Sequence, residues 1–108
     1  MRRQEDQMNE TDRSLPDVRR FVAEECLAGK EYFCDSWELL SAFERWCEDH
    51  DIKLPGGTAF FGNMEVIGFR TRTVFAVDAY AIRDRWSKFL EGLNGTFYLG
   101  IDLKREKY

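Results

Sequence analysis

Cysteine, proline and histidine are scarce in this sequence, which has three, two and one of them among 108 residues. The cysteines are odd in number and form no Cys-x-x-Cys pair, so nothing indicates a disulfide scaffold. No apolar run approaches the roughly 20 residues that span a membrane. The first residues are polar and charged, unlike a signal peptide. We therefore expect a cytoplasmic protein with reduced thiols and no membrane contact.

A metal site would have to use the set Cys26, Cys34, Cys47 and His50. Cys47 and His50 are three residues apart, so both can face one metal ion from a single helix. Cys26 and Cys47, however, continue the apolar stripes of their helices, where cysteine usually acts as a small hydrophobic residue. We interpret the three thiols as core groups and expect no metal.

Patterns that accompany catalysis are also missing. His50 stands near Cys47 and beside two aspartates, but a solvated helix end accounts for this grouping better than a catalytic pair. The pairs Gly56-Gly57 and Asn94-Gly95 lack the flanking residues of a phosphate-binding loop. We expect neither enzymatic activity nor a cofactor.

Charge is distributed unevenly along the chain. Residues 24–51 carry nine acidic and two basic side chains, a balance of −7. Residues 52–108 carry nine basic and six acidic side chains, a balance of +3, and residues 1–23 carry five of each sign. A nucleic acid is therefore expected to contact only the second half of the chain.

Length and composition predict one domain with one core, since hydrophobic residues make up 44% of the chain. Residues 1–13 are polar and nearly free of large apolar groups, which predicts a disordered tail or a linker. The folded domain is expected over residues 14–108.

The first helix is predicted over residues 14–29. Ser14 is its expected N-cap, Pro16 falls in its first turn, and Gly29 ends it. The short aromatic segment of residues 30–34 predicts a strand that pairs with a later hairpin.

A helix, a turn and a second helix are predicted over residues 35–68. Asp35 is the expected N-cap of the first helix, whose apolar residues recur at the spacing of one buried face. That face comprises Leu39, Leu40, Phe43, Trp46 and Cys47. A proline and two glycines in residues 52–57 indicate the turn. Thr58 is the predicted cap of the second helix, and Gly68 its left-handed end.

Apolar and polar residues alternate in residues 69–75 and again in residues 97–103, which predicts two strands. In the first strand Arg70 and Arg72 occupy the open face. The residues of the second strand expected to face the core are Phe97, Leu99, Ile101 and Leu103. Residues 78–93 have the pattern of a helix inserted between the two strands.

This order of elements predicts an α+β fold of the winged helix-turn-helix type. Its core would be three helices, and its wing a β-hairpin with the extra helix inserted between the wing strands.

Several short motifs support this interpretation. They are Phe21 and Cys26, the helix end Phe43-Glu44-Arg45-Trp46-Cys47, the turn Gly56-Gly57-Thr58, the pair Phe60 and Met64, and the closing Gly100-Ile101-Asp102-Leu103. Together they resemble the C-terminal winged-helix domain of phage- and plasmid-encoded primase-helicases, a group that includes the satellite-phage replication protein and the poxvirus primase-helicase. The resemblance covers most of residues 18–104. It implies a domain that follows a helicase ring, is similar to origin-binding modules and has no catalytic residues.

The sequence departs from this family in two respects. The wing strands of the family are usually joined by a short loop, whereas residues 76–95 make a longer insert here. The expected recognition helix also has no lysine or arginine between Gly56 and Gly68. A grip on DNA phosphates must then come from cations outside that helix.

The candidate DNA-binding residues form two groups. Thr58 and Asn63 are expected on the exposed side of the recognition helix, where an asparagine can read adenine. The expected phosphate contacts are Lys53, Arg70 and Arg72, together with Arg83, Arg85 and Lys88 of the inserted helix. The tryptophans and phenylalanines, Trp37 included, are interpreted as core residues rather than as a base-stacking platform.

We therefore expect a non-enzymatic module that binds duplex, origin-like DNA in the replication primase-helicase of a phage or mobile element. A helix would lie at the major groove, and arginines of the wing would contact flanking phosphates. The alternative is a protein-docking module. In that case the acidic surface of residues 24–51, or the inserted helix, contacts replication proteins or a helicase domain without touching DNA.

Overall fold

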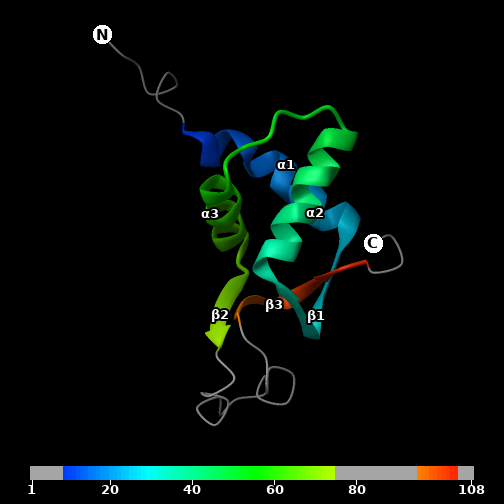
Figure 1. Cartoon of the computed structure of the whole chain (residues 1–108), viewed down its shortest axis with the longest axis vertical. Coiled ribbons are helices and arrows are strands. Elements are labelled where there is room, and N and C mark those ends of the chain that lie inside the picture. Colours follow the sequence, from blue (N-terminus) through cyan, green and yellow to red (C-terminus); the bar gives the residue numbers. More distant parts are fainter. Residues whose placement is uncertain (1–8, 75–94, 105–108) are drawn as a thin grey trace.

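The computed structural model describes residues 9–74 and 95–104, which form three helices and a three-stranded antiparallel sheet. In chain order these are α1 (Glu10–Glu25), β1 (Cys26–Asp35), α2 (Ser36–Asp49), α3 (Gly57–Ile67), β2 (Arg70–Val74) and β3 (Gly95–Leu103). The helices gather at one end of the molecule and the sheet at the other (Figure 1). This α+β arrangement is compatible with a winged-helix-like fold. The predicted inserted helix lies outside the described residues.

Helix α1 begins at Glu10, four residues before the predicted start. Its N-cap is Asn9, whose Oδ1 accepts a hydrogen bond from the amide of Asp12 at 2.8 Å. Ser14, the predicted cap, lies inside the helix and donates its hydroxyl to the carbonyl oxygen of Glu10 at 2.6 Å. The prediction of a tail up to residue 13 was therefore wrong for the residues of the first helical turn. Asn9 offers the same capping chemistry as Ser14, so the local pattern alone did not separate the two starts.

Sheet pairing, rather than the predicted glycine, ends α1. Cys26 is extended and pairs with Leu103 of β3, so the chain leaves the helix immediately after Glu25. Lys104 then donates its main-chain N–H to the carbonyl oxygen of Glu25 at 3.0 Å, and its Nζ to that of Glu24 at 2.9 Å. These bonds satisfy carbonyl groups that a helix end leaves without a partner. The predicted strand at residues 30–34 is confirmed as part of the longer β1.

The central strand of the sheet is β3, with β1 on one side and β2 on the other. Its residues in the main core cluster are Tyr98, Ile101 and Leu103, so the predicted alternation holds for Ile101 and Leu103 but not for Leu99. The reason is Gly100, whose φ of +86° marks an irregularity at which the register with β1 also shifts. The additional residues at this irregularity lie in β1, where residues 29–32 stand opposite Gly100, and the positive φ of Gly100 turns the following side chains of β3 to the other face.

Before the bulge, the aromatic residues of β3 lie on opposite faces of the sheet. Phe97 packs edge-on against Phe33 of β1, with ring centroids 6.0 Å apart, on the face opposite Tyr98. Leu99, which follows Tyr98, is only half-buried. Phe97 is therefore buried as expected, but on the other face of the sheet from Tyr98, whereas Leu99 is not part of the core.

The helix-turn-helix prediction is largely confirmed. Asp35 caps α2, its Oδ1 accepting the amides of Trp37 and Glu38 at 2.9 and 3.1 Å. Gly68 ends α3 with a φ of +118°, a left-handed conformation that suits glycine. The predicted cap Thr58 was wrong, because α3 already begins at Gly57 and has no side-chain cap.

One phenylalanine from each helix forms the centre of the core. Phe21 of α1, Phe43 of α2 and Phe60 of α3 are fully buried. Their ring centroids lie 5.4 Å apart for Phe21 and Phe43, 6.4 Å for Phe21 and Phe60, and 4.8 Å for Phe43 and Phe60. Mutual aromatic contacts of this kind add to the hydrophobic gain of burial and fix how the helices pack.

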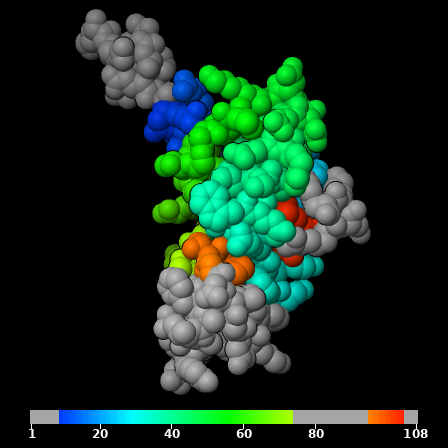
Figure 2. All heavy atoms as spheres, viewed as in Figure 1, coloured from blue at the N-terminus to red at the C-terminus, as the bar shows by residue number. Residues whose placement is uncertain are grey.

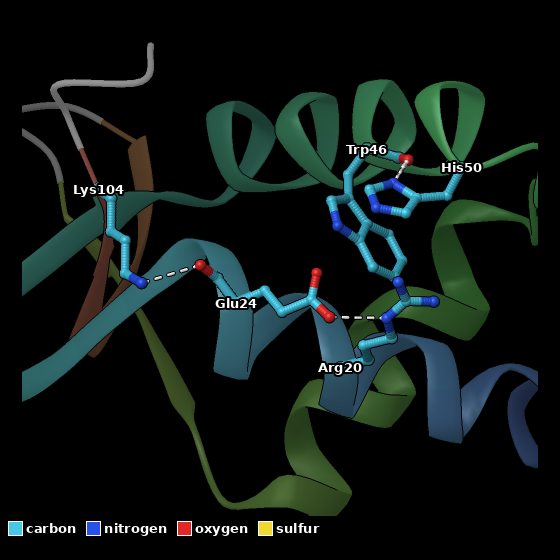
Figure 3. Close-up of polar contacts among 5 residues, drawn as sticks. All are labelled: Arg20, Glu24, Trp46, His50 and Lys104. Carbon is cyan, nitrogen blue, oxygen red and sulfur yellow. Dashed lines mark hydrogen bonds and ion pairs between the residues drawn. The ribbon is translucent and has the colours of Figure 1, made fainter.

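Trp46 of α2 extends this cluster and is buried as predicted, with 3% of its surface exposed. Figure 3 shows how its ring is enclosed. The guanidinium of Arg20 lies over it at 5.2 Å, and the His50 ring lies 4.6 Å away with Nδ1 2.8 Å from the Trp46 carbonyl oxygen. Arg20 also donates to Glu24 at 2.7 Å, and this bond lowers the pKa of the Glu24 carboxyl below its ordinary value.

Replacement of Trp46 by alanine should lower the free energy of unfolding by about 3–5 kcal/mol, the usual range for a large aromatic residue lost from a core. The matched control is Trp37→Ala, which removes a tryptophan that is 65% exposed and should cost less than about 1 kcal/mol. Denaturant unfolding measures both values. Equal stabilities for the two variants would contradict this packing.

Candidate functional site

Asn63, which the sequence predicted to contact DNA bases, points into the core. It is fully buried, and its Nδ2 donates a hydrogen bond to the hydroxyl of Ser14 at 2.8 Å. It shares the buried face of α3 with Ala59, Phe60 and Met64. The prediction that Asn63 contacts DNA from an exposed position was therefore wrong. The signal was present in the sequence, because a residue three after Phe60 belongs to the same helix face.

The surface of α3 is nearly uncharged. Thr58, Glu65 and Val66 are its exposed residues, and Val66 is 61% exposed. Thr58 thus lies on the surface, as expected, but in the first turn rather than at the cap. The Glu10 carboxylate accepts the amide of Gly56 at 2.8 Å, just before α3 begins. A phosphate at this end of α3 would meet that negative charge, which opposes the favourable helix dipole.

Exposed cations lie just beyond each end of α3. Lys53 stands in the loop that precedes the helix, and Arg70 is the first residue of the strand that follows it. The 11 residues of α3 extend about 16 Å at 1.5 Å per residue, a little more than the roughly 12 Å width of the major groove. Neither Lys53 nor Arg70 has an ion-pair partner within the described residues.

The other predicted phosphate contacts are either less exposed than Lys53 and Arg70 or lie outside the described residues. Arg72 is half-buried, and it lies two residues after Arg70 and therefore on the same face of β2. The predicted phosphate contacts Arg83, Arg85 and Lys88 lie outside the described residues.

A groove that the sequence did not predict lies between the start of α2, α3 and the sheet. Its volume is about 870 Å³, and it is lined by Ser36, Trp37, Phe61, Glu65, Gly68, Phe69, Arg70, Thr71, Thr96 and Tyr98. In the space-filling view the first residues of β3 (orange) reach the surface between β2 and the start of α2, where this groove lies (Figure 2).

Trp37 forms an exposed wall of the groove, contrary to its interpretation as a core residue. It is 65% exposed and meets Phe61 edge-on, at 5.9 Å and an angle of 84°. Phe61 in turn lies 6.2 Å from Tyr98 of β3. Helical spacing did not distinguish Trp37 from a core residue, because its position lies in the first turn of α2, where fewer neighbours cover a side chain.

The three cysteines are buried, so their thiols are poorly placed for chemistry. Burial raises the pKa of Cys26 to about 12 and that of Cys47 to about 11. Both therefore stay neutral at physiological pH, whereas a nucleophile or metal ligand is a thiolate. Within the described ranges, no three side chains of the metal-binding types come together, and none of the helices there is apolar over a membrane-spanning length.

Comparison of the chain with protein-family models, curated proteins and solved structures found no match. The site is therefore interpreted from its own geometry. Its notable features are the inward-facing Asn63, the cations beyond both ends of α3, and the aromatic groove.

Replacement of Asn63 by alanine should lower the free energy of unfolding by about 1–2 kcal/mol, because the buried bond to Ser14 is lost. The cost stays moderate since Asn63 Oδ1 has no partner among the described residues, and the variant removes this unsatisfied acceptor as well. The control is Thr58→Ala on the exposed side of α3, which should change stability by less than about 0.5 kcal/mol. Thermal or denaturant unfolding gives both values. A fully stable Asn63→Ala protein would mean that α3 is rotated differently.

Proposed function

We propose that this chain is a winged-helix-like module that binds duplex DNA as part of a phage or mobile-element replication primase-helicase. The observation that carries the proposal is the placement of Lys53 and Arg70 beyond opposite ends of α3. The order of helices and strands, and β3 as the central strand, are compatible with this fold. In a winged-helix-like fold, β2 and β3 are the two strands of the wing.

Binding occurs mainly through the DNA backbone. Lys53 and Arg70 contact phosphates on the two sides of the groove that α3 approaches, and Arg72 extends the contact along β2. Base reading is weak, because α3 offers only Thr58 and Glu65 as exposed polar groups. Phosphate contacts fix position and orientation but carry no sequence information. The module therefore increases the DNA affinity of a replication protein more than it contributes to the recognition of a particular DNA sequence.

The acidic surface of α2 turns away from the duplex. Glu48 and Asp49 are exposed at the end of this helix, and Asp51 follows in the loop. The field of Glu48 and Asp49 repels phosphate, so DNA approaches from the side of α3 and β2, whereas Asp51 lies two residues before Lys53 and weakens the attraction there.

A second candidate function is docking of a cationic replication protein on that acidic surface. The observation that favours it is the exposure of Glu48, Asp49 and Asp51 together with the lack of a cation on α3 itself. In this case DNA binding is absent, so a salt series with duplex DNA distinguishes the two functions.

The affinity for duplex DNA should fall with salt, with a slope of log K against log salt near −3. Each neutralised phosphate contributes about −0.9, and Lys53, Arg70 and Arg72 supply three contacts. Replacement of either Lys53 or Arg70 by alanine should lower the magnitude of the slope by about one. It should also weaken the binding of all DNA sequences alike.

The matched control is Arg19→Ala, which removes an exposed cation of α1 and should leave the slope unchanged. Fluorescence anisotropy with labelled duplexes measures every slope. Failure to bind any duplex at low salt, or equal effects of all three variants, would contradict the proposal.

A further inference from the structure

The start of α3 is held by a residue of α1. Gly56, just before α3, has no side chain with which to cap the helix, and the carboxylate of Glu10 accepts its amide instead, at 2.8 Å. Gly56 also leaves room for this carboxylate, because a β-carbon there would stand 3.1 Å from Oε1 of Glu10. A bond between residues 46 positions apart in the sequence therefore fixes a negative charge at the beginning of the helix that approaches DNA in the proposed complex.

This carboxylate lines a crevice that also contains a proposed phosphate contact. The crevice lies between α1 and the loop before α3, has a volume of about 280 Å³, and its charged lining residues are Glu10, Arg13, Asp17 and Lys53. Lys53 precedes Gly56 by three residues, so their Cα atoms are at most about 11 Å apart. That distance is close to the roughly 8–10 Å over which charges act on one another at physiological salt. The charge of Glu10 therefore weakens the attraction between Lys53 and a phosphate.

Glu10 belongs to the part of α1 that opens most easily. It is the first residue of the helix, and helix ends fray because their first amides have no partner inside the helix. The first turn is held by the bond of Glu10 to Gly56 and by the bond from the amide of Asp12 to the cap Asn9, both at 2.8 Å. Opening of this turn moves the carboxylate away from the crevice.

We propose that the first turn of α1 is an autoinhibitory latch for DNA binding. In the closed state Glu10 weakens the contact of Lys53 with phosphate, and in the open state Lys53 binds phosphate at full strength. A duplex that binds at Lys53 favours the open state, so DNA binding and the release of Glu10 are coupled. The inference rests on the proposed function, because it requires that Lys53 contacts DNA.

The test measures the affinity of the full chain for a labelled duplex by fluorescence anisotropy. Glu10→Gln keeps an oxygen that accepts the Gly56 amide but removes the charge, and it should raise the affinity about two- to fivefold, the effect of one charge at a helix end. The matched control Asp12→Asn removes the same charge from the same turn, outside the crevice. It should change the affinity by less than about 1.5-fold at about 0.15 M salt, because salt screens the more distant charge.

Two further variants test the route by which Glu10 acts. In a Lys53→Ala protein the additional change Glu10→Gln should have no effect, because the cation on which Glu10 acts is gone. Asn9→Ala weakens the cap of the turn and leaves every charge in place, so it should raise the affinity as Glu10→Gln does.

The outcomes separate the latch from the proposed function. Equal affinities of the Glu10→Gln and Asp12→Asn proteins overturn the latch and leave the proposed function in place. A gain from Glu10→Gln that persists without Lys53, or no gain from Asn9→Ala, also overturns the latch alone. Failure of every variant to bind duplex at low salt overturns the proposed function and the latch with it.

Discussion

The hydrogen bond between Asn63 and Ser14 is the interaction on which the functional surface depends. It joins α3 to α1 through two buried polar side chains, 2.8 Å apart, beside the aromatic contact of Phe60 with Phe21 and Phe43. A buried amide without a partner is costly, so the bond permits only a narrow range of rotations of α3 about its axis. That rotation determines which residues of α3 remain outside.

In the proposed complex with DNA, the outward side of α3 consequently contributes little to base recognition. Val66 and Glu65 offer little to a base edge, and the cations stand before and after the helix, at Lys53 and Arg70. The first residue of β2, Arg70, lies just after α3 and also borders the groove that contains Trp37.

Much of the fold was predictable because its signals are local. The cap at Asp35, the left-handed Gly68 and the stripe containing Trp46 follow from neighbouring residues alone. The predictions failed where contacts between residues far apart in the sequence determine the local structure. Cys26 leaves α1 because it pairs with Leu103 across the sheet. The change of face at Gly100 brings Tyr98 rather than Leu99 into the core.

The site was less predictable than the fold for the same physical reason. Asn63 is polar, which suggested a surface position although its spacing from Phe60 places it on the buried face of α3. Its partner there is the hydroxyl of Ser14, 49 residues away in the sequence. Nuclear magnetic resonance of the chain with short duplex DNA at low salt tests the resulting account most directly. The account predicts shifts at the backbone amides of Lys53, Thr58 and Arg70, and none at the side-chain amide of Asn63. Shifts concentrated on Asn63, or on Glu48 and Asp49, would contradict it.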